Sequence, residues 1–218
     1  MEVWDDEQLK YFLSEIEDSW LYMRITLISL TGLRVYEACD LRWSNIDLDN
    51  GIIHVCEQVI NDKTNKKFIH TDSLNTVKSY RDISISKFLV SILKSHKLKQ
   101  PFSNKDFVIL DIHTKMYNPR NLSMNFTKVL NKYKLIIDST TANTKDKIKL
   151  YQQLHQISIR GFHHTHATIL LLNGENVKVI SERLEHNSIK ITMDTYSHVL
   201  PSMKRQTSDL LDDVFDVL

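Results

Sequence analysis

The chain contains little glycine, proline or cysteine. Among its 218 residues are 4 glycines, 3 prolines and 2 cysteines, and 42% of the residues are hydrophobic. A chain of this length and composition can bury one good-sized core, so we expect a single domain over residues 1–218. The two cysteines, Cys39 and Cys56, are too few for a disulfide framework or a thiolate metal site, and we expect both to be buried thiols.

Long hydrophobic runs are also missing. No segment approaches the roughly 20 uninterrupted apolar residues that a membrane span needs, because Arg24 interrupts the apolar segment 20–30. The N-terminus is too acidic for a signal peptide, since seven of its first 18 residues are Asp or Glu. We therefore expect a soluble, cytoplasmic protein that has no membrane partner.

The formal net charge of +1 conceals an uneven distribution. Residues 1–18 carry a net charge of −6 and residues 209–218 carry −4, which leaves +11 for residues 19–208. A basic body between acidic ends suits a protein that binds a polyanion, although an ordinary solvated surface can show the same asymmetry.

Hydrophobic spacing predicts a mostly α fold with a small antiparallel β-sheet, an α+β class. Apolar residues recur at helical intervals along most of the chain, whereas Ile83 and Ile85 alternate with polar residues. Ser86 is expected to cap a helix, and Pro119 to open another. The predicted helices cover 6–18, 19–30, 35–41, the segments after Ser86 and after Asn118, 159–173, 177–184 and 188–195, and the predicted strands cover 52–59 and 83–85.

Two segments stand apart from this plan. Residues 138–153 are polar and lack a clear period, so we expect a mobile loop inside the domain. Residues 202–218 combine acidic residues with apolar residues at helical spacing, which predicts a C-terminal helical tail.

The segment ISIRGFHHTHA, residues 157–167, places an arginine and three histidines at the start of a predicted helix. The first turn of a helix favours anions, so a phosphate contact is one interpretation. A core role for His164 or His166, as a donor to backbone carbonyls, is another. A metal site is less favoured, because no Asp, Glu or Cys near this segment completes a ligand set.

Two further motifs accompany this cluster: TGLRVYEACDLRWSNID at 31–47 and LEHNSIKITMDTYSHV at 184–199. Together with ISIRGFHHTHATILL at 157–171, they occur in the order and spacing of the tyrosine recombinase, or phage integrase, family. The chain resembles this family over nearly its whole length. The resemblance implies a tyrosine recombinase catalytic domain that cleaves and rejoins DNA through a 3′-phosphotyrosyl intermediate and needs no cofactor.

The resemblance also implies residue roles. Arg34 would hold the scissile phosphate, because its forked guanidinium matches two phosphate oxygens. Glu37 would orient Arg34 or support the helix, and an ordinary surface glutamate is the alternative. Tyr196 would be the nucleophile, and His186 would donate a hydrogen bond to the phosphate. The implied catalytic residues are Arg34, Arg160, His163, His186 and Tyr196.

The chain departs from the family pattern at three places. The family usually has His and Arg where this chain has Arg160 and His163, so the two residue types are exchanged. Asn75 stands at the position of the family's general-acid lysine, and Lys78 or His163 is a candidate substitute, although Lys78 also fits an ordinary surface lysine. Glu185 replaces a usual glycine and adds a carboxylate beside the phosphate site.

Three hypotheses follow: a recombinase or integrase catalytic domain, a catalytically impaired DNA-binding relic of the same fold, and, less favoured, a histidine-dependent metal hydrolase. The expected partner is double-stranded DNA at attachment sites. The resemblance also implies a tetramer on DNA, joined through the C-terminal tail, and an N-terminal DNA-clamp domain that this chain does not include. The residues expected to contact DNA are Lys63, Lys66, Lys67 and Arg81.

Overall fold

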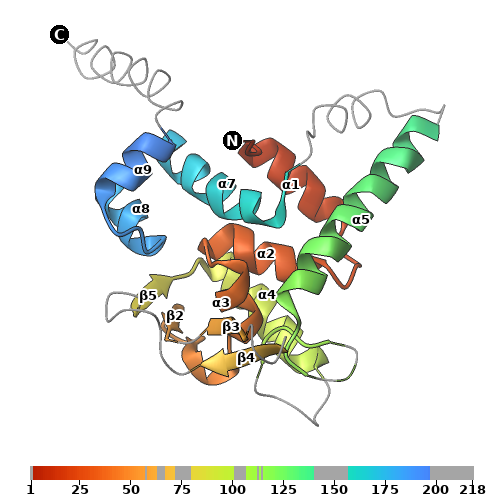
Figure 1. The fold of residues 1–218 in the computed structure, drawn as a ribbon, viewed down its shortest axis with the longest axis horizontal. Coiled ribbons are helices and arrows are strands. Elements are labelled where there is room, and N and C mark those ends of the chain that lie inside the picture. Colours follow the sequence, from red (N-terminus) through yellow and green to blue (C-terminus); the bar gives the residue numbers. More distant parts are fainter. Residues whose placement is uncertain are drawn as a thin grey trace.

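The fold was obtained as a computed structural model that describes residues 2–56, 58–62, 67–71, 80–100, 107–111, 113, 115–139 and 157–196. Helix α2 (Tyr22–Thr31) lies at its centre, between α7 (Ile159–Leu172) on one side and α3 (Val35–Asp40) with the strands on the other (Figure 1). The remaining elements of the helical part are α1 (Asp6–Glu15), the 3-10 helix η1 (Trp43–Asn45), α4 (Lys87–Lys99), α5 (Pro119–Ser139), α8 (Val177–Arg183) and α9 (Ile189–Thr195).

The strands form two small antiparallel sheets beside the helices. Strands β1 (Ile46–Asp47), β2 (Ile52–Val55) and β5 (Arg81–Ser84) pair in the order β1-β2-β5, and the buried Ile53 lies opposite the buried Ile83. Strands β3 (Gln58–Asp62) and β4 (Lys67–Thr71) form a separate pair. The prediction of a mostly helical fold with a small antiparallel sheet is confirmed.

Local sequence signals set most element boundaries. The Ser86 hydroxyl accepts a hydrogen bond from the Leu89 amide at 3.2 Å, and α5 begins at Pro119, both as predicted. Helix α5 continues to Ser139, so it includes the first two residues of the expected loop over 138–153. The rest of that loop lies outside the described residues, as does the tail over 202–218.

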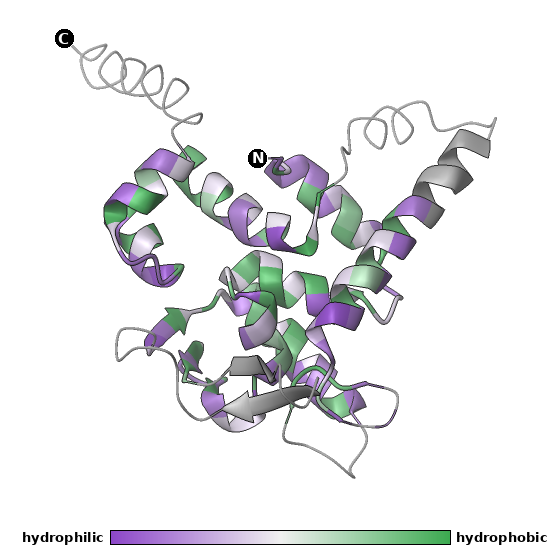
Figure 2. Ribbon diagram, viewed as in Figure 1, coloured by the Kyte–Doolittle hydropathy of each residue, from purple (hydrophilic) through white to green (hydrophobic). Residues whose placement is uncertain are grey.

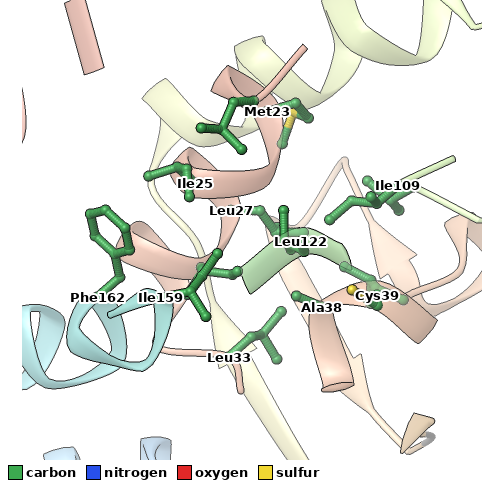
Figure 3. Close-up of a cluster of buried hydrophobic side chains, with 14 of the residues drawn as sticks. Met23, Ile25, Leu27, Leu33, Ala38, Cys39, Ile109, Leu122, Ile159 and Phe162 are labelled. Atoms are coloured by element: carbon green, nitrogen blue, oxygen red, sulfur yellow. The ribbon is translucent and has the colours of Figure 1, made fainter. Parts of the chain in front are cut away.

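The main hydrophobic core surrounds α2. Figure 3 shows Ile25 and Leu27 of α2 together with Ala38, Leu122 and Phe162 from the neighbouring helices. Hydrophobic residues gather along α2, whereas hydrophilic residues interrupt them on α1 and α5 (Figure 2). This pattern explains why α2, which is apolar on most of its faces, packs in the interior.

The two cysteines occupy different environments. Cys39 is fully buried in the core, where burial raises the pKa of its thiol to about 12. Cys56 is only partly buried, so the expectation of two buried thiols holds for Cys39 alone.

A second, smaller core joins the C-terminal helices. Ala167 and Leu171 of α7 pack with Ile180 and Leu184 near α8 and with Tyr196, which ends α9. This cluster fixes the position of Tyr196 relative to α7. Within the ranges that the structure describes, no helix is long and apolar enough to cross a membrane.

Candidate active site

Gly32 determines how the chain leaves α2 and enters α3. Its φ of 73° is left-handed, and a Cβ at this position would lie 2.7 Å from Cδ2 of His166 and 2.8 Å from Cδ2 of Leu184. Only glycine fits such a close approach without strain. The tight turn brings Arg34, the N-cap residue of α3, against the start of α7 and the end of α8.

The Glu37 carboxylate pairs with two arginines, Arg34 and Arg81. Its carboxylate accepts hydrogen bonds from the Arg34 backbone amide at 2.8 Å and from Nη1 of Arg34 at 3.2 Å. It also accepts a bidentate pair from Arg81, at 2.9 and 2.8 Å. Burial alone would raise the pKa of the Glu37 carboxyl, but these bonds and the charges of both arginines outweigh burial and lower the pKa. These contacts place the Glu37 carboxylate directly against Arg34, the residue that it is expected to orient.

The Arg81 side chain is largely buried next to Glu37. Only 8% of its side chain is exposed, and its Nε donates to the carbonyl oxygen of Arg183 at 2.8 Å. Its guanidinium pairs with Glu37, and the expected contact of Arg81 with DNA stays a prediction.

The lysines expected to contact DNA and the general-acid positions fall mostly outside the described ranges. The structure describes the backbone of Lys67 at the start of β4, without its side chain. Lys63, Lys66, Asn75 and Lys78 lie outside the described residues.

A second carboxylate contacts Arg34 from the α8–α9 connection. Nη1 of Arg34 donates to the side chain of Glu185, and Nη2 donates to the carbonyl oxygens of Leu184 at 3.2 Å and Glu185 at 3.1 Å. Glu185 has a φ of 57°, the sole left-handed non-glycine residue in the described part of the chain. The expected phosphate-binding arginine is therefore paired with two carboxylates.

Helix α7 carries Arg160 and His163 on adjacent turns, in different environments. Arg160 is exposed at the first turn, and within the described ranges it makes no salt bridge. His163 is buried, and its Nδ1 lies 2.7 Å from the carbonyl oxygen of Gly32. Because that oxygen can only accept, Nδ1 carries the proton. Burial lowers the pKa of His163 to about 3, so the ring is neutral and its Nε2 is an acceptor.

His164 contacts the candidate nucleophile. Its Nδ1 lies 3.0 Å from Oη of Tyr196. Burial, with the nearby charge of Arg160, lowers the pKa of His164 to about 4, so this ring is also neutral. Tyr196 is almost fully buried, and burial raises the pKa of its phenol despite an opposing effect of Arg160.

Of His164 and His166, the two candidates for a core role, His166 has it. Nδ1 of His166 donates to the carbonyl oxygen of Ser29 at 2.9 Å, and its Nε2 accepts from Nε of Arg183 at 2.9 Å. His164, in contrast, belongs to the site. Its place within the histidine motif was the available signal, but periodicity could not show that Tyr196 would meet it.

His186 completes the group of residues around Arg34. Its Nδ1 lies 2.7 Å from Oγ1 of Thr192 on α9, and its ring centroid lies 6.1 Å from that of His163. Burial and the charge of Arg34 lower the pKa of His186.

The candidate site is a cavity of about 540 Å³ that lies between α2, α3, α5, α7 and α9. Four of the five expected catalytic residues line it, and Tyr196 adjoins it through the bond to His164. Arg120 of α5 also lines the cavity and was not expected, because its segment carries no motif of its own. The cationic and histidine residues that line it are Arg34, Arg120, Arg160, His163, His164 and His186.

The described part of the chain offers no support for the metal hydrolase hypothesis. Among the residues that the structure describes, no group of three or more His, Cys, Asp or Glu side chains is placed to hold a metal ion. Nδ1 of His163 and of His166 is committed to a backbone carbonyl, and Nδ1 of His164 contacts Tyr196.

Comparisons with known proteins identify the family of the chain. The model of the phage integrase family matches residues 2–203. The ICEBs1 integrase of Bacillus subtilis (strain 168) is 29% identical over 98% of this chain, and a XerC-like tyrosine recombinase of Caldanaerobacter subterraneus subsp. tengcongensis is 27% identical over 99% of it. The chain spans about half the length of these relatives, 55% of each.

Solved structures show the same fold. The Tn1549 transposon integrase, in complex with circular intermediate DNA, is 20% identical and superposes with a TM-score of 0.74 over 96% of this chain and 67% of that one. The XerA recombinase is 19% identical and gives a TM-score of 0.66 over 95% of this chain and 63% of that one. The family match over most of the chain, together with this fold and these motifs, shows that the chain belongs to the phage integrase family.

Proposed function

We propose that the chain is the catalytic domain of a site-specific DNA recombinase or integrase, with Tyr196 as its nucleophile. One observation carries the proposal. One cavity is lined by Arg34, Arg160 and His186, and Tyr196 adjoins it. These residues come from three separate motifs, and more than a hundred residues of sequence separate the first motif from the other two. A tyrosine beside clustered cations is the arrangement that phosphoryl transfer to a tyrosine requires.

The proposed reaction is an exchange of phosphoesters. Oη of Tyr196 attacks the phosphorus of a DNA phosphodiester, the bond from phosphorus to the 5′-oxygen breaks, and a 5′-hydroxyl leaves. The proton of the Tyr196 hydroxyl passes to Nδ1 of His164, 3.0 Å away, and the leaving oxygen is protonated by Lys78 or by water. A 5′-hydroxyl of a partner strand reverses the step, and the phosphotyrosyl bond conserves the energy of the broken bond.

Each remaining side chain has a role that follows from its charge and place. Arg34 and Arg160 would stabilise the negative charge that builds on the nonbridging oxygens. His186 would donate to the same phosphate, and its ring is oriented by Thr192. Glu37, with Arg81 behind it, would keep Arg34 directed at the phosphate.

A second candidate function is DNA binding with little strand cleavage. His163 favours it, because a neutral ring that already donates to Gly32 has only an acceptor nitrogen left and repels a phosphate oxygen. Burial of the Tyr196 phenol favours it as well. We therefore propose that cleavage by this chain is slow compared with a protein that has His at position 160 and Arg at position 163.

The proposed partner is double-stranded DNA at attachment sites, and the residues proposed to contact it are Lys63, Lys66, Lys67 and Arg81. Assembly into a tetramer through the tail over 202–218 remains part of the proposal. The chain spans about half the length of its relatives, so these partner assignments are proposals for this domain.

Covalent trapping tests the proposal. The chain is incubated in EDTA with a nicked attachment-site duplex, taken from the ends of the element that encodes it, and adducts are resolved on denaturing gels. The comparison includes Tyr196→Phe and a triple variant, Asn75→Lys with Arg160→His and His163→Arg.

We expect a slow adduct with the unaltered chain, none with Tyr196→Phe, and a faster one with the triple variant. An adduct from the triple variant alone would favour the DNA-binding function. An adduct that survives Tyr196→Phe would refute the assignment of the nucleophile.

A further inference from the structure

Glu185 sits in a conformation that its residue type disfavours. Its φ of 57° lies in the left-handed region, which glycine adopts readily and a residue with a Cβ does not. Such strain persists only where surrounding contacts over-determine it. The contacts that do so here join the α8–α9 connection to Arg34.

Those contacts occupy the donors that a phosphate needs. Nη1 of Arg34 donates to the carboxylates of Glu37 and Glu185, and Nη2 donates to the carbonyl oxygens of Leu184 and Glu185. Nη1 and Nη2 carry four N–H groups in all. A phosphate bound by the guanidinium fork must therefore displace at least one of these acceptors.

We propose that Glu185 is an internal competitor for the phosphate, so that DNA binds Arg34 only when the α8–α9 connection releases the Glu185 carboxylate. The inference rests on the proposed function, because it takes Arg34 as the phosphate ligand. It adds that Glu185 sets the affinity of Arg34 for a phosphate.

Burial and charge identify Glu185, and not Glu37, as the carboxylate that moves. The Glu37 side chain is 2% exposed and is held by both terminal nitrogens of Arg81. The Glu185 side chain is 16% exposed, lies on a connection between helices, and reaches Nη1 of Arg81 only at 3.6 Å. When Glu185 is released, Glu37 still aligns Arg34. The positive charge of Arg34 is then neutralised by one carboxylate fewer and is available to a phosphate.

The test is a double-mutant cycle on DNA binding. Fluorescence anisotropy measures the affinity for a labelled 30-bp duplex of arbitrary sequence at several salt concentrations, because phosphate contacts do not depend on sequence. Glu185→Gln removes the charge, and Glu185→Gly also relieves the left-handed φ. Both are made with Arg34 intact and with Arg34→Ala, and thermal unfolding confirms that each variant is folded.

The matched control is Glu182→Gln. Glu182 is 69% exposed on α8 and pairs with Lys178 at 4.0 Å, so this variant changes the net charge equally without touching Arg34. It corrects for the general gain in affinity that any added positive charge produces.

With Arg34 intact, we expect Glu185→Gln to bind DNA about tenfold more tightly than Glu182→Gln, the size of one charge-assisted contact. The plot of log affinity against log salt should steepen by about 0.9, as for one added phosphate contact. With Arg34→Ala, both gains should vanish.

Equal affinities for the Glu185 and Glu182 variants, or a gain that survives Arg34→Ala, would overturn the inference while leaving the proposed function standing. If Arg34→Ala changes DNA affinity in neither the unaltered chain nor Glu185→Gln, Arg34 is not the phosphate ligand. The proposed function would then fail at this residue, and the inference with it.

Discussion

Glu37→Gln should destabilise the fold far more than its single-atom change suggests. The substitution leaves the Arg81 guanidinium, 8% exposed, without its bidentate partner. Removing one member of a buried ion pair costs about 3–5 kcal/mol, because the remaining charge stays buried and uncompensated. Glu185, 3.6 Å from Arg81, compensates part of that charge, so we expect about 3 kcal/mol.

Urea and thermal denaturation measure this loss. For a chain of this size each kcal/mol lowers the melting temperature by about 2–4 °C, so the expected shift is about 6–12 °C. Glu182→Gln serves as the control, because its pair with Lys178 is exposed and should contribute less than about 0.5 kcal/mol.

A double variant, Glu37→Gln with Arg81→Met, separates an unpaired charge from simple loss of packing. It should recover part of the stability, since it removes the charge that Glu37→Gln strands. A loss below about 1 kcal/mol for Glu37→Gln, or a double variant less stable by the sum of two independent losses, would refute the reasoning.

Two further predictions concern stability. Gly32→Ala should lower the free energy of unfolding by about 2–4 kcal/mol in chemical denaturation, because its Cβ would clash with His166 and Leu184 in addition to the left-handed strain. Gly174 is also left-handed but has no atom within 4 Å of an added Cβ, so Gly174→Ala should cost about 1 kcal/mol, and equal losses for the two variants would contradict the clash. Burial lowers the pKa values of His163 and His166 to about 3 and about 4, below the unfolded value of about 6.5, so the unfolded chain binds more protons between these values. The stability they contribute is complete above about pH 6.5 and declines on acidification, by about 2 kcal/mol per histidine between pH 7 and 5; denaturation midpoints that rise towards pH 5 would contradict this sign.

The sequence by itself determined most of the elements and pointed to most of the candidate site residues. Apolar spacing and caps are local properties, so they predicted α1, α2, α4, α7, α8 and α9 within a few residues. The three motifs identified Arg34, Arg160 and Tyr196, because their residue types and spacing are specific when they occur together. The family match confirmed the resemblance that these motifs carried.

The tertiary structure alone decided the electrostatic state of those residues. Arg34 meets Glu185 across 151 positions of sequence, and Arg81 meets Glu37 across 44. His163 and His164 are neighbours with the same side chain, yet one donates to Gly32 and the other contacts Tyr196. Charge pairing and burial depend on which distant segments pack together, and local periodicity carries no information about that packing.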